Sequence, residues 1–234
     1  MFHKKNQQAN MKNINDDLIA LKQEINSTIR PIKLIAVSKT HSEAAILEAI
    51  NAGQQDFGEN YAQEMSSKAI NLENHSISWH FIGTIQSNKT KLIAKHASWV
   101  HTLTTPQHAK RLNDQRAEDS PPLNILIEVN ISNEESKGGL KSYAEIYELA
   151  KVVTDLPRLK LKGLMGMPSN TKDEQLLKQQ FNLLSQYLYQ LNQNGFELEH
   201  LSMGMSNDYK IAIECGSTMI RIGSKIFGER NYDK

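Results

Sequence analysis

Lys39 follows a short apolar run with one serine between them, and its amine could do chemistry. The preceding residues Leu34–Val37 are all apolar. A lysine whose stem lies in such surroundings loses hydration of its charged form, which lowers the amine pKa and makes it a nucleophile for an aldehyde. A solvated lysine that simply emerges at the protein surface is the alternative interpretation of the same position.

Two segments near the carboxyl end could hold an anion. In the segment Ser202–Ser206 (SMGMS), Gly204 permits close backbone approach, and we expect Ser206 to stand at the start of a helix over Asn207–Cys215. The unpaired N–H groups at a helix start favour an anion. Gly223 and Ser224 offer a second set of donors. Each segment alone is also compatible with ordinary loop glycines and a helix cap, but the pair together indicates a phosphate.

Arg221 stands next to the second of these segments. An arginine is always charged and only donates hydrogen bonds, so its partner must be an acceptor. An ion pair with Glu59, Glu214 or Glu229 is the alternative to a role in ligand binding. An amine, a strong donor and an anion cradle in one place would suit a phosphorylated aldehyde.

The elements that must position these residues alternate between strand and helix. The strands are expected at Lys33–Val37, Asp56–Gly58, Ser78–Ile82, Trp99–Thr102, Leu123–Val129, Leu159–Met165, His200–Ser202 and Met219–Ile222. The clearest helices are expected at Ile14–Ile29, where Pro31 ends the helix, and at Tyr143–Thr154, Asp173–Gln193 and Asn207–Cys215.

Eight such units predict an α/β fold: a single TIM-type (β/α)8 barrel with an extra N-terminal helix, formed as one domain over residues 1–234. An open doubly wound sheet is the alternative. In a parallel barrel the functional residues gather at the carboxyl ends of the strands. Closure would make the first and last strands neighbours and place Lys39 and Arg221 side by side.

The composition excludes several classes of function. Lys and Arg total 27 and Asp and Glu 26, a net charge of +1, so we expect no nucleic-acid partner. The single cysteine, Cys215, indicates a reducing compartment. We find no signal peptide and no apolar run long enough to span a membrane, so we expect a cytoplasmic protein, and a monomer. The eight histidines lack the spacing of metal ligands, so no metal is predicted.

Five motifs of the chain, in order over about Ile14 to Arg230, resemble those of the pyridoxal phosphate homeostasis proteins, the YggS/PROSC family. The motifs are Ala36-Val37-Ser38-Lys39-Thr40, Phe57-Gly58-Glu59-Asn60-Tyr61, Trp79-His80-Phe81-Ile82-Gly83 with Gln86 and Asn88-Lys89, Ser202-Met203-Gly204-Met205-Ser206 with Asp208, and Arg221-Ile222-Gly223. The chain departs from the common pattern at Ser42, where proline is frequent, and at Ser224, where threonine is frequent.

The resemblance implies the barrel of the alanine racemase N-terminal domain, with pyridoxal 5′-phosphate (PLP) as cofactor held as a Schiff base on Lys39. It implies that Arg221 faces the pyridine nitrogen and that Ser206, Gly223 and Ser224 hold the phosphate. Asn60 and His80 would lie close to the cofactor ring. The family acts in vitamin B6 balance and has no established reaction. Transient contact with PLP-dependent enzymes is a further expectation for such a protein.

Three hypotheses follow. The first is a protein that stores, buffers or hands over PLP without catalytic turnover. The second is a PLP-dependent amino-acid racemase of the alanine racemase type, which is disfavoured because we expect the additional C-terminal domain that carries the racemases' second acid/base to be missing. The third is a barrel enzyme that acts on a free phosphorylated metabolite with Lys39 as its Schiff-base nucleophile.

Overall fold

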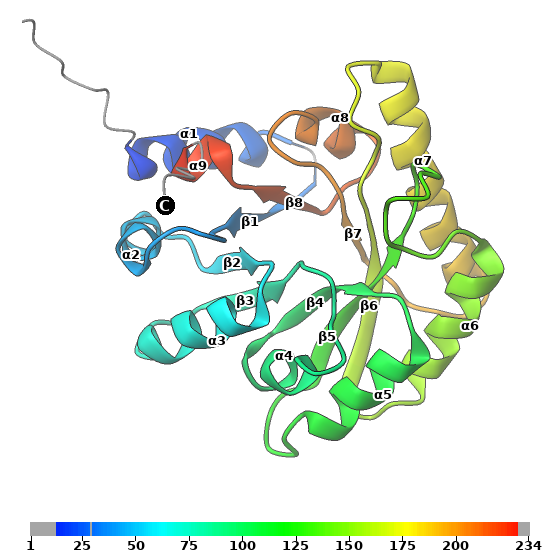
Figure 1. Cartoon of the computed structure of the whole chain (residues 1–234). Coiled ribbons are helices and arrows are strands. Elements are labelled where there is room, and N and C mark those ends of the chain that lie inside the picture. The colour runs from blue at the N-terminus through cyan, green and yellow to red at the C-terminus, as the bar shows by residue number, and fades with distance from the viewer. Residues whose placement is uncertain (1–12, 29, 229–234) are drawn as a thin grey trace, which may run out of the picture.

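Parallel strands pair in chain order and close into a barrel, because β1 pairs with β2 on one side and with β8 on the other. This is the arrangement in the computed structural model, which describes residues 13–28 and 30–228 (Figure 1). The strands are β1 (Lys33–Val37), β2 (Asp56–Glu59), β3 (Ser78–Phe81), β4 (Trp99–Leu103), β5 (Leu123–Val129), β6 (Leu159–Gly166), β7 (His200–Ser202) and β8 (Met219–Ile222).

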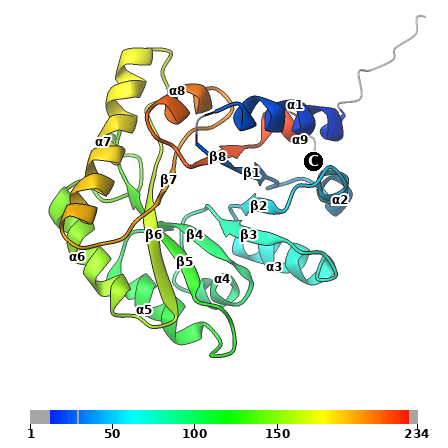
Figure 2. The same ribbon diagram turned by 180° about the vertical axis from the view of Figure 1, so that it is seen from behind.

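Helices follow the strands and surround the barrel, as the view from behind also shows (Figure 2). They are α1 (Ile14–Asn26), α2 (Glu43–Asn51), α3 (Ala62–Asn71), α4 (Thr90–His96), α5 (Pro106–Gln115), α6 (Tyr143–Thr154), α7 (Glu174–Gln193), α8 (Tyr209–Glu214) and α9 (Ser224–Phe227). Their starts follow local chemistry: the Ser42 side chain accepts a hydrogen bond from the Ala45 N–H, and Ser142 and Glu145 form a capping box.

Alternate residues along each strand pack on opposite sides of the sheet. One set contacts the helices in a large buried cluster that includes Leu34, Ala36 and Ile220. The residues between them form a separate, small cluster inside the barrel. Its buried members are Ile35, Trp99, Leu126, Met165 and Met219. The middle layer of the barrel interior is therefore a packed apolar core, and polar side chains inside the barrel are exceptions to this pattern.

The predicted (β/α)8 barrel with its N-terminal helix is confirmed, and the open sheet is excluded by the pairing of β1 with β8. Every predicted strand lies within one residue of its observed bounds. The structure adds a short helix, α9, after the last strand. The N-terminal helix α1 packs beside α2 and α9 (Figure 1), so it covers the barrel where β1 meets β8.

Two predicted helices have different bounds in the structure. The first helix ends at Asn26, five residues before Pro31. It ends there because the hydroxyls of Ser27 and Thr28 donate to the carbonyls of Glu24 and Ile25. The predicted terminal residue Ile29 lies outside the described residues. The eighth helix, α8, is also shorter than expected.

Candidate functional site

Lys39 lies in a tight turn at the carboxyl end of β1. The N–H of His41 donates to the carbonyl of Ser38 at 3.0 Å and closes the turn. Thr40 has a φ of 67°, a left-handed conformation that costs a non-glycine residue about 1–3 kcal/mol. Lys39 itself is half-buried. A strained turn persists only where its surroundings hold it, so neighbouring groups must stabilise this one.

A buried ion-pair network supplies that support. The Nζ of Lys68, on α3, lies 2.8 Å from Oε1 of Glu59 and 2.7 Å from Oε1 of Glu64, and it donates to the Ser38 carbonyl at 2.8 Å. The Ser38 hydroxyl donates to the same Glu59 oxygen at 2.6 Å, and the Thr40 N–H donates to Glu64 at 2.6 Å. Both residues that flank Lys39 are therefore tied to one charged cluster.

The charge of Glu59 is fully enclosed. Its side chain is 0% exposed, and among the described residues its Oε2 has no hydrogen-bond partner. Burial raises the pKa of the Glu59 carboxyl, while the charge and hydrogen bond of Lys68 oppose that rise. Lys68 is the cation that makes an ionised Glu59 tolerable here.

Asn60, at the end of β2, carries a second buried acceptor. Its Oδ1 is buried and has no hydrogen-bond partner among the described residues. The backbone beside it is close to Gly83, where an added Cβ would lie 1.9 Å from the Asn60 carbonyl oxygen. Gly83 therefore allows the ends of β2 and β3 to meet, and Asn60 offers an acceptor that a bound group could satisfy.

The two serines predicted to hold a phosphate come together. The Oγ of Ser224 donates to the Oγ of Ser206 at 3.2 Å, so hydroxyls from the segments after β7 and β8 share one place. Gly204, in the first segment, has a φ of 97° and no room for a Cβ, which would lie 2.7 Å from that of Ala212. Gly223 lies against the end of β1, since its Cβ would be 3.3 Å from the Val37 carbonyl.

The expected helix start at Ser206 is wrong. The helix begins at Tyr209 with Asp208 as its N-cap, and it ends at Glu214 rather than Cys215. The Asp208 carboxylate accepts a hydrogen bond from the Met205 N–H at 2.6 Å, which holds Ser206 in a turn ahead of the helix. An anion beside Ser206 would therefore meet the hydroxyl and turn N–H groups of this segment rather than the first turn of α8.

Arg221 is buried in β8 and held at both ends of its guanidinium. Its Nη1 donates to the Ser202 hydroxyl at 2.6 Å, and its Nη2 donates to the Gly166 carbonyl at 3.2 Å. Burial lowers the pKa of Arg221 to about 10, opposed by the charges of Asp208 and Glu128, so it stays cationic at neutral pH. The β1–β8 register pairs Arg221 with Ile35, in the strand that leads to Lys39.

Two of the three glutamates considered as ion-pair partners of Arg221 pair with lysines instead. Glu59 pairs with Lys68, and Glu214 pairs with Lys178 at 3.0 Å. Glu229, the third, lies outside the described residues. Two of the five guanidinium N–H groups make the bonds to Ser202 and Gly166. The remaining N–H groups can donate to an acceptor at the rim.

His80 lies inside the barrel with both ring nitrogens engaged by protein groups. Its Nε2 is 2.9 Å from Oδ1 of Asp56, and its Nδ1 is 2.9 Å from Nε2 of His101. Burial lowers the pKa of His80 although Asp56 opposes that shift. Proximity of His80 to the cofactor ring stays a prediction, and its ring nitrogens already have partners.

Sequence reasoning missed two groups of residues. The network around Lys68 left a faint signal, the i, i+4 spacing of Glu64 and Lys68 on a helix. His101 and Ser202 are 2.9 Å apart but are separated by 101 positions in the chain. Only the alternation of side chains along β4 and β7 could have indicated that both point into the barrel.

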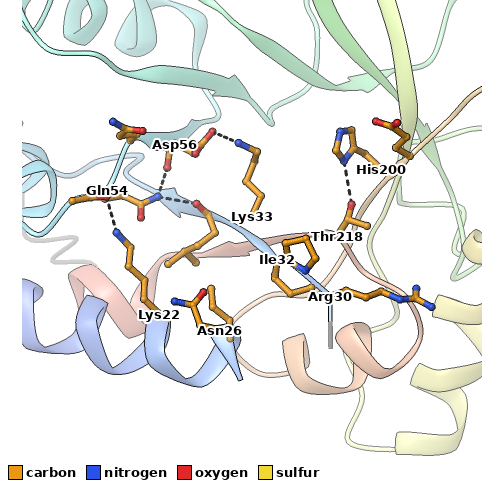
Figure 3. A pocket seen from close by; sticks show the side chains of 15 residues that line it. Lys22, Asn26, Arg30, Ile32, Lys33, Gln54, Asp56, His200 and Thr218 are labelled. Atoms are coloured by element: carbon orange, nitrogen blue, oxygen red, sulfur yellow. Dashed lines mark hydrogen bonds and ion pairs between the residues drawn. The ribbon is translucent and has the colours of Figure 1, made fainter. Parts of the chain in front are cut away.

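A cavity of about 640 Å³ lies at the other mouth of the barrel (Figure 3). It is lined by residues at the amino ends of strands, including Lys33, Asp56 and His200, together with Lys22 and Arg30. Lys33 and Asp56 form an ion pair of 3.0 Å across it. Neither Lys39 nor Arg221 lines this cavity, so it is separate from the rim that carries the predicted cofactor residues.

Two other features are absent from the described part of the chain. Over residues 13–28 and 30–228, no helix has the length and apolarity to cross a bilayer. Within the same described part of the chain, no three histidine, cysteine or acidic side chains gather as metal ligands would.

Comparison with known proteins gives consistent results. Residues 11–231 match the family model of the alanine racemase N-terminal domain. The pyridoxal phosphate homeostasis protein of Vibrio alginolyticus is 46% identical over 229 residues, which cover 96% of this chain and 98% of that protein.

Solved structures show the same fold. PipY of Synechococcus elongatus PCC7942, solved with PLP bound, is 30% identical and superposes with a TM-score of 0.82 over 92% of this chain and 100% of its own. An alanine racemase from Bacillus anthracis is 15% identical with a TM-score of 0.71, over 94% of this chain and 57% of that one. The last comparison concerns the fold alone.

Proposed function

The chain belongs to the pyridoxal phosphate homeostasis proteins of the alanine racemase N-terminal domain family, and from this we propose that it binds PLP as a Schiff base on Lys39. The observation that carries the proposal is the convergence at one rim of Lys39, the donor Arg221 and the paired hydroxyls of Ser206 and Ser224. These groups come from the ends of β1, β7 and β8, which are neighbours in the closed barrel.

The donors at this rim suit the parts of the cofactor. The hydroxyls of Ser206 and Ser224, with the backbone at Gly223, can donate to a phosphate. Arg221 can donate to the pyridine nitrogen. Asn60 has a buried Oδ1 without a partner among the described residues, and the phenolic O–H or another donor of a bound molecule could satisfy it. Each assignment extends the family resemblance to a residue whose surroundings in this chain are compatible with it.

The identity of Arg221 bears on whether the protein turns over substrate. When bound, PLP supplies an aldehyde for a lysine amine and, if its ring nitrogen is protonated, an electron sink for reactions of amino acids. Arg221 is cationic and only donates, so an acceptor that faces it must be unprotonated. Arg221 therefore holds the proton away from the ring nitrogen and disfavours catalysis.

We accordingly favour a role in intracellular vitamin B6 homeostasis, in which the protein stores or buffers PLP without robust turnover. A racemase of the alanine racemase type remains the alternative function. The cytoplasmic location, the monomeric state and transient contact with PLP-dependent enzymes stay predictions.

The test is the visible absorbance of the purified protein with PLP. Wild type should gain the absorbance band of a lysine-bound cofactor, and Lys39→Ala should lose it while keeping its fold. Lys91→Ala, which removes an exposed lysine from α4, is the matched control and should behave as wild type.

Three outcomes would contradict the proposal. A band retained in Lys39→Ala would show that another lysine carries the cofactor. A wild-type protein that gains no band would favour the third hypothesis, an enzyme for a free phosphorylated metabolite. Racemisation of alanine at about 1 s⁻¹, the low end of ordinary enzyme turnover, would establish the racemase alternative.

A further inference from the structure

A line of hydrogen-bonded side chains crosses the barrel interior, which is otherwise apolar in its middle layer. Arg221 Nη1 donates to Ser202 Oγ at 2.6 Å, and Ser202 Oγ is 2.9 Å from His101 Nδ1. His101 Nε2 is 2.9 Å from His80 Nδ1, and His80 Nε2 is 2.9 Å from Asp56 Oδ1. The five residues come from β8, β7, β4, β3 and β2. The line thus connects the proposed cofactor rim to the opposite mouth.

The Asp56 end determines which nitrogen of each histidine carries the proton. Burial works against ionisation of Asp56, but the hydrogen bond from His80 and the charge and hydrogen bond of Lys33 oppose it, and the carboxyl pKa lies below its usual range. An ionised carboxylate only accepts, so His80 must donate through Nε2. Ser78 Oγ, at 3.4 Å from the same nitrogen, is the more distant neighbour.

Because both histidine rings are neutral, the donor at one ring nitrogen fixes the acceptor at the other. Burial lowers the pKa of His80 and holds that of His101 well below its ordinary value, so both rings are neutral at pH 7. A neutral His80 that donates through Nε2 must accept at Nδ1, and His101 must therefore donate through its own Nε2. His101 then accepts at Nδ1, from the Ser202 hydroxyl.

The Arg221 end of the line requires the same direction of hydrogen bonding. A guanidinium cannot accept a hydrogen bond, so the Ser202 oxygen must accept from Arg221. The single proton of the Ser202 hydroxyl is then available for His101 Nδ1, as the reasoning from Asp56 requires. Two independent ends of the line agree on one arrangement of protons.

Packing fixes the rings that form the line. His80 stacks on Trp99 with ring centroids 5.7 Å apart and planes 5° apart, and it meets His101 edge-on at 5.1 Å. Ser202, His80 and His101 are each 0% exposed. With water excluded and both rings immobilised, each hydrogen bond is made in a low-dielectric environment, where it is strongest.

We propose that Ser202, His101 and His80 are positioning residues that form a one-way hydrogen-bonded relay from Arg221 to Asp56 and hold the Arg221 guanidinium ready for the cofactor. The cofactor part of this inference rests on the proposed function. Nη1 is held by Ser202 from β7 and Nη2 by Gly166 from β6, and these two bonds fix the guanidinium plane. A donor that is already oriented loses less entropy when it binds its acceptor.

The acceptor end of the relay opens to the cavity at the amino mouth. Asp56 and Lys33 both line it, and Figure 3 shows their ion pair among the lining side chains. Substitutions there can alter the relay without touching the proposed cofactor site. Lys22 lines the same cavity but donates to the carbonyls of Ala52 and Gly53 rather than to Asp56, so Lys22→Ala is a matched control.

The first experiment needs no cofactor. Nitrogen-15 NMR of the histidine rings in the wild-type protein at neutral pH distinguishes the two tautomers and the protonated ring. The relay requires that His80 and His101 both carry the proton on Nε2 and none on Nδ1. A proton on Nδ1 of either ring would overturn it.

The second experiment measures PLP affinity in variants. Ser202→Ala should weaken binding by about ten- to hundredfold, the value of a hydrogen bond to a charged group. Asp56→Ala should weaken it several-fold and disturb the His80 tautomer, while Asp56→Asn, which keeps an acceptor, and Lys22→Ala should stay near wild type.

The outcomes separate the relay from the proposed function. Wild-type affinity in both Ser202→Ala and Asp56→Ala would overturn the positioning role. Equal losses in Asp56→Ala and Asp56→Asn would also contradict it, because only the former removes the acceptor. Failure of the wild-type protein to bind PLP would instead overturn the proposed function, and the histidine tautomers would still decide whether the relay exists.

Discussion

Replacing Lys68 with methionine should destabilise the protein strongly, because it leaves a buried carboxylate without its cation. Lys68 is 7% exposed in its side chain and Glu59 is 0% exposed, and their charged atoms are 2.8 Å apart. Breaking such a pair by removing one partner costs about 3–5 kcal/mol, since the remaining charge cannot be hydrated. Methionine keeps most of the aliphatic volume, so the loss reports mainly on charge.

The assay is urea unfolding, which gives the free energy of unfolding in water. Lys151→Met is the matched control, because Lys151 pairs with Glu148 at a site where the side chains are 48% and 66% exposed. An exposed pair of this kind contributes about 0–1 kcal/mol. Lys68→Met combined with Glu59→Gln should recover much of the lost stability, because both buried charges are then removed.

The destabilisation should also depend on pH. Burial already raises the pKa of Glu59, and loss of Lys68 removes the main opposing charge, so the folded-state pKa rises further above that of the unfolded chain. A group with a raised folded-state pKa contributes stability below its unfolded pKa and loses it as pH rises through the folded value. Lys68→Met should therefore lose less stability near pH 5 than near pH 8. A loss below about 1 kcal/mol at both pH values, as in the exposed control, would refute the reasoning.

Three further predictions concern the site and the N-terminal helix α1. Arg221→Glu should bind PLP less tightly but, once loaded, convert it to pyridoxamine phosphate faster than wild type in single turnover with excess amino acid; an unchanged rate would leave Arg221 with a binding role only. Pyridoxal without its phosphate should bind at least about tenfold more weakly than PLP, and Ser206→Ala with Ser224→Ala should reduce that difference; equal affinity for the two vitamers would place the phosphate site elsewhere. Leu18→Ala should lower the free energy of unfolding by about 2–5 kcal/mol, because Leu18 is 0% exposed on α1; a change within 0.5 kcal/mol, as at a surface position, would show that α1 is not part of the core.

The strands could be predicted from sequence because burial on both faces leaves a strong pattern. Lys33–Val37 and Leu123–Val129 are short β-branched or leucine-rich runs between turn residues, and both have the predicted bounds. Helix ends were harder to predict. Ser27 and Asp208 hydrogen-bond to nearby backbone groups, and the end of α1 and the start of α8 therefore differ from the predicted bounds. The apolar periodicity of the sequence does not show this local competition.

The site was predictable only in part. Lys39 and Arg221 stand at or near the carboxyl ends of strands, a position that follows from the barrel. The contacts of Lys68 with Glu59 and Ser38 depend on how α3 packs against the rim, which no spacing in the sequence encodes. The pairing of His101 with Ser202 depends on closure and register, so it becomes visible only when the strands are placed.

The central claim is that Lys39 alone carries the cofactor, and the most direct test is chemical. PLP-loaded protein is reduced with borohydride, which converts a Schiff base to a stable secondary amine, then digested and mapped by mass spectrometry. We predict the cofactor mass on the peptide that contains Lys39, at close to one per chain. Recovery of the label on Lys89 or Lys137 instead, with Lys39 unmodified, would contradict the account.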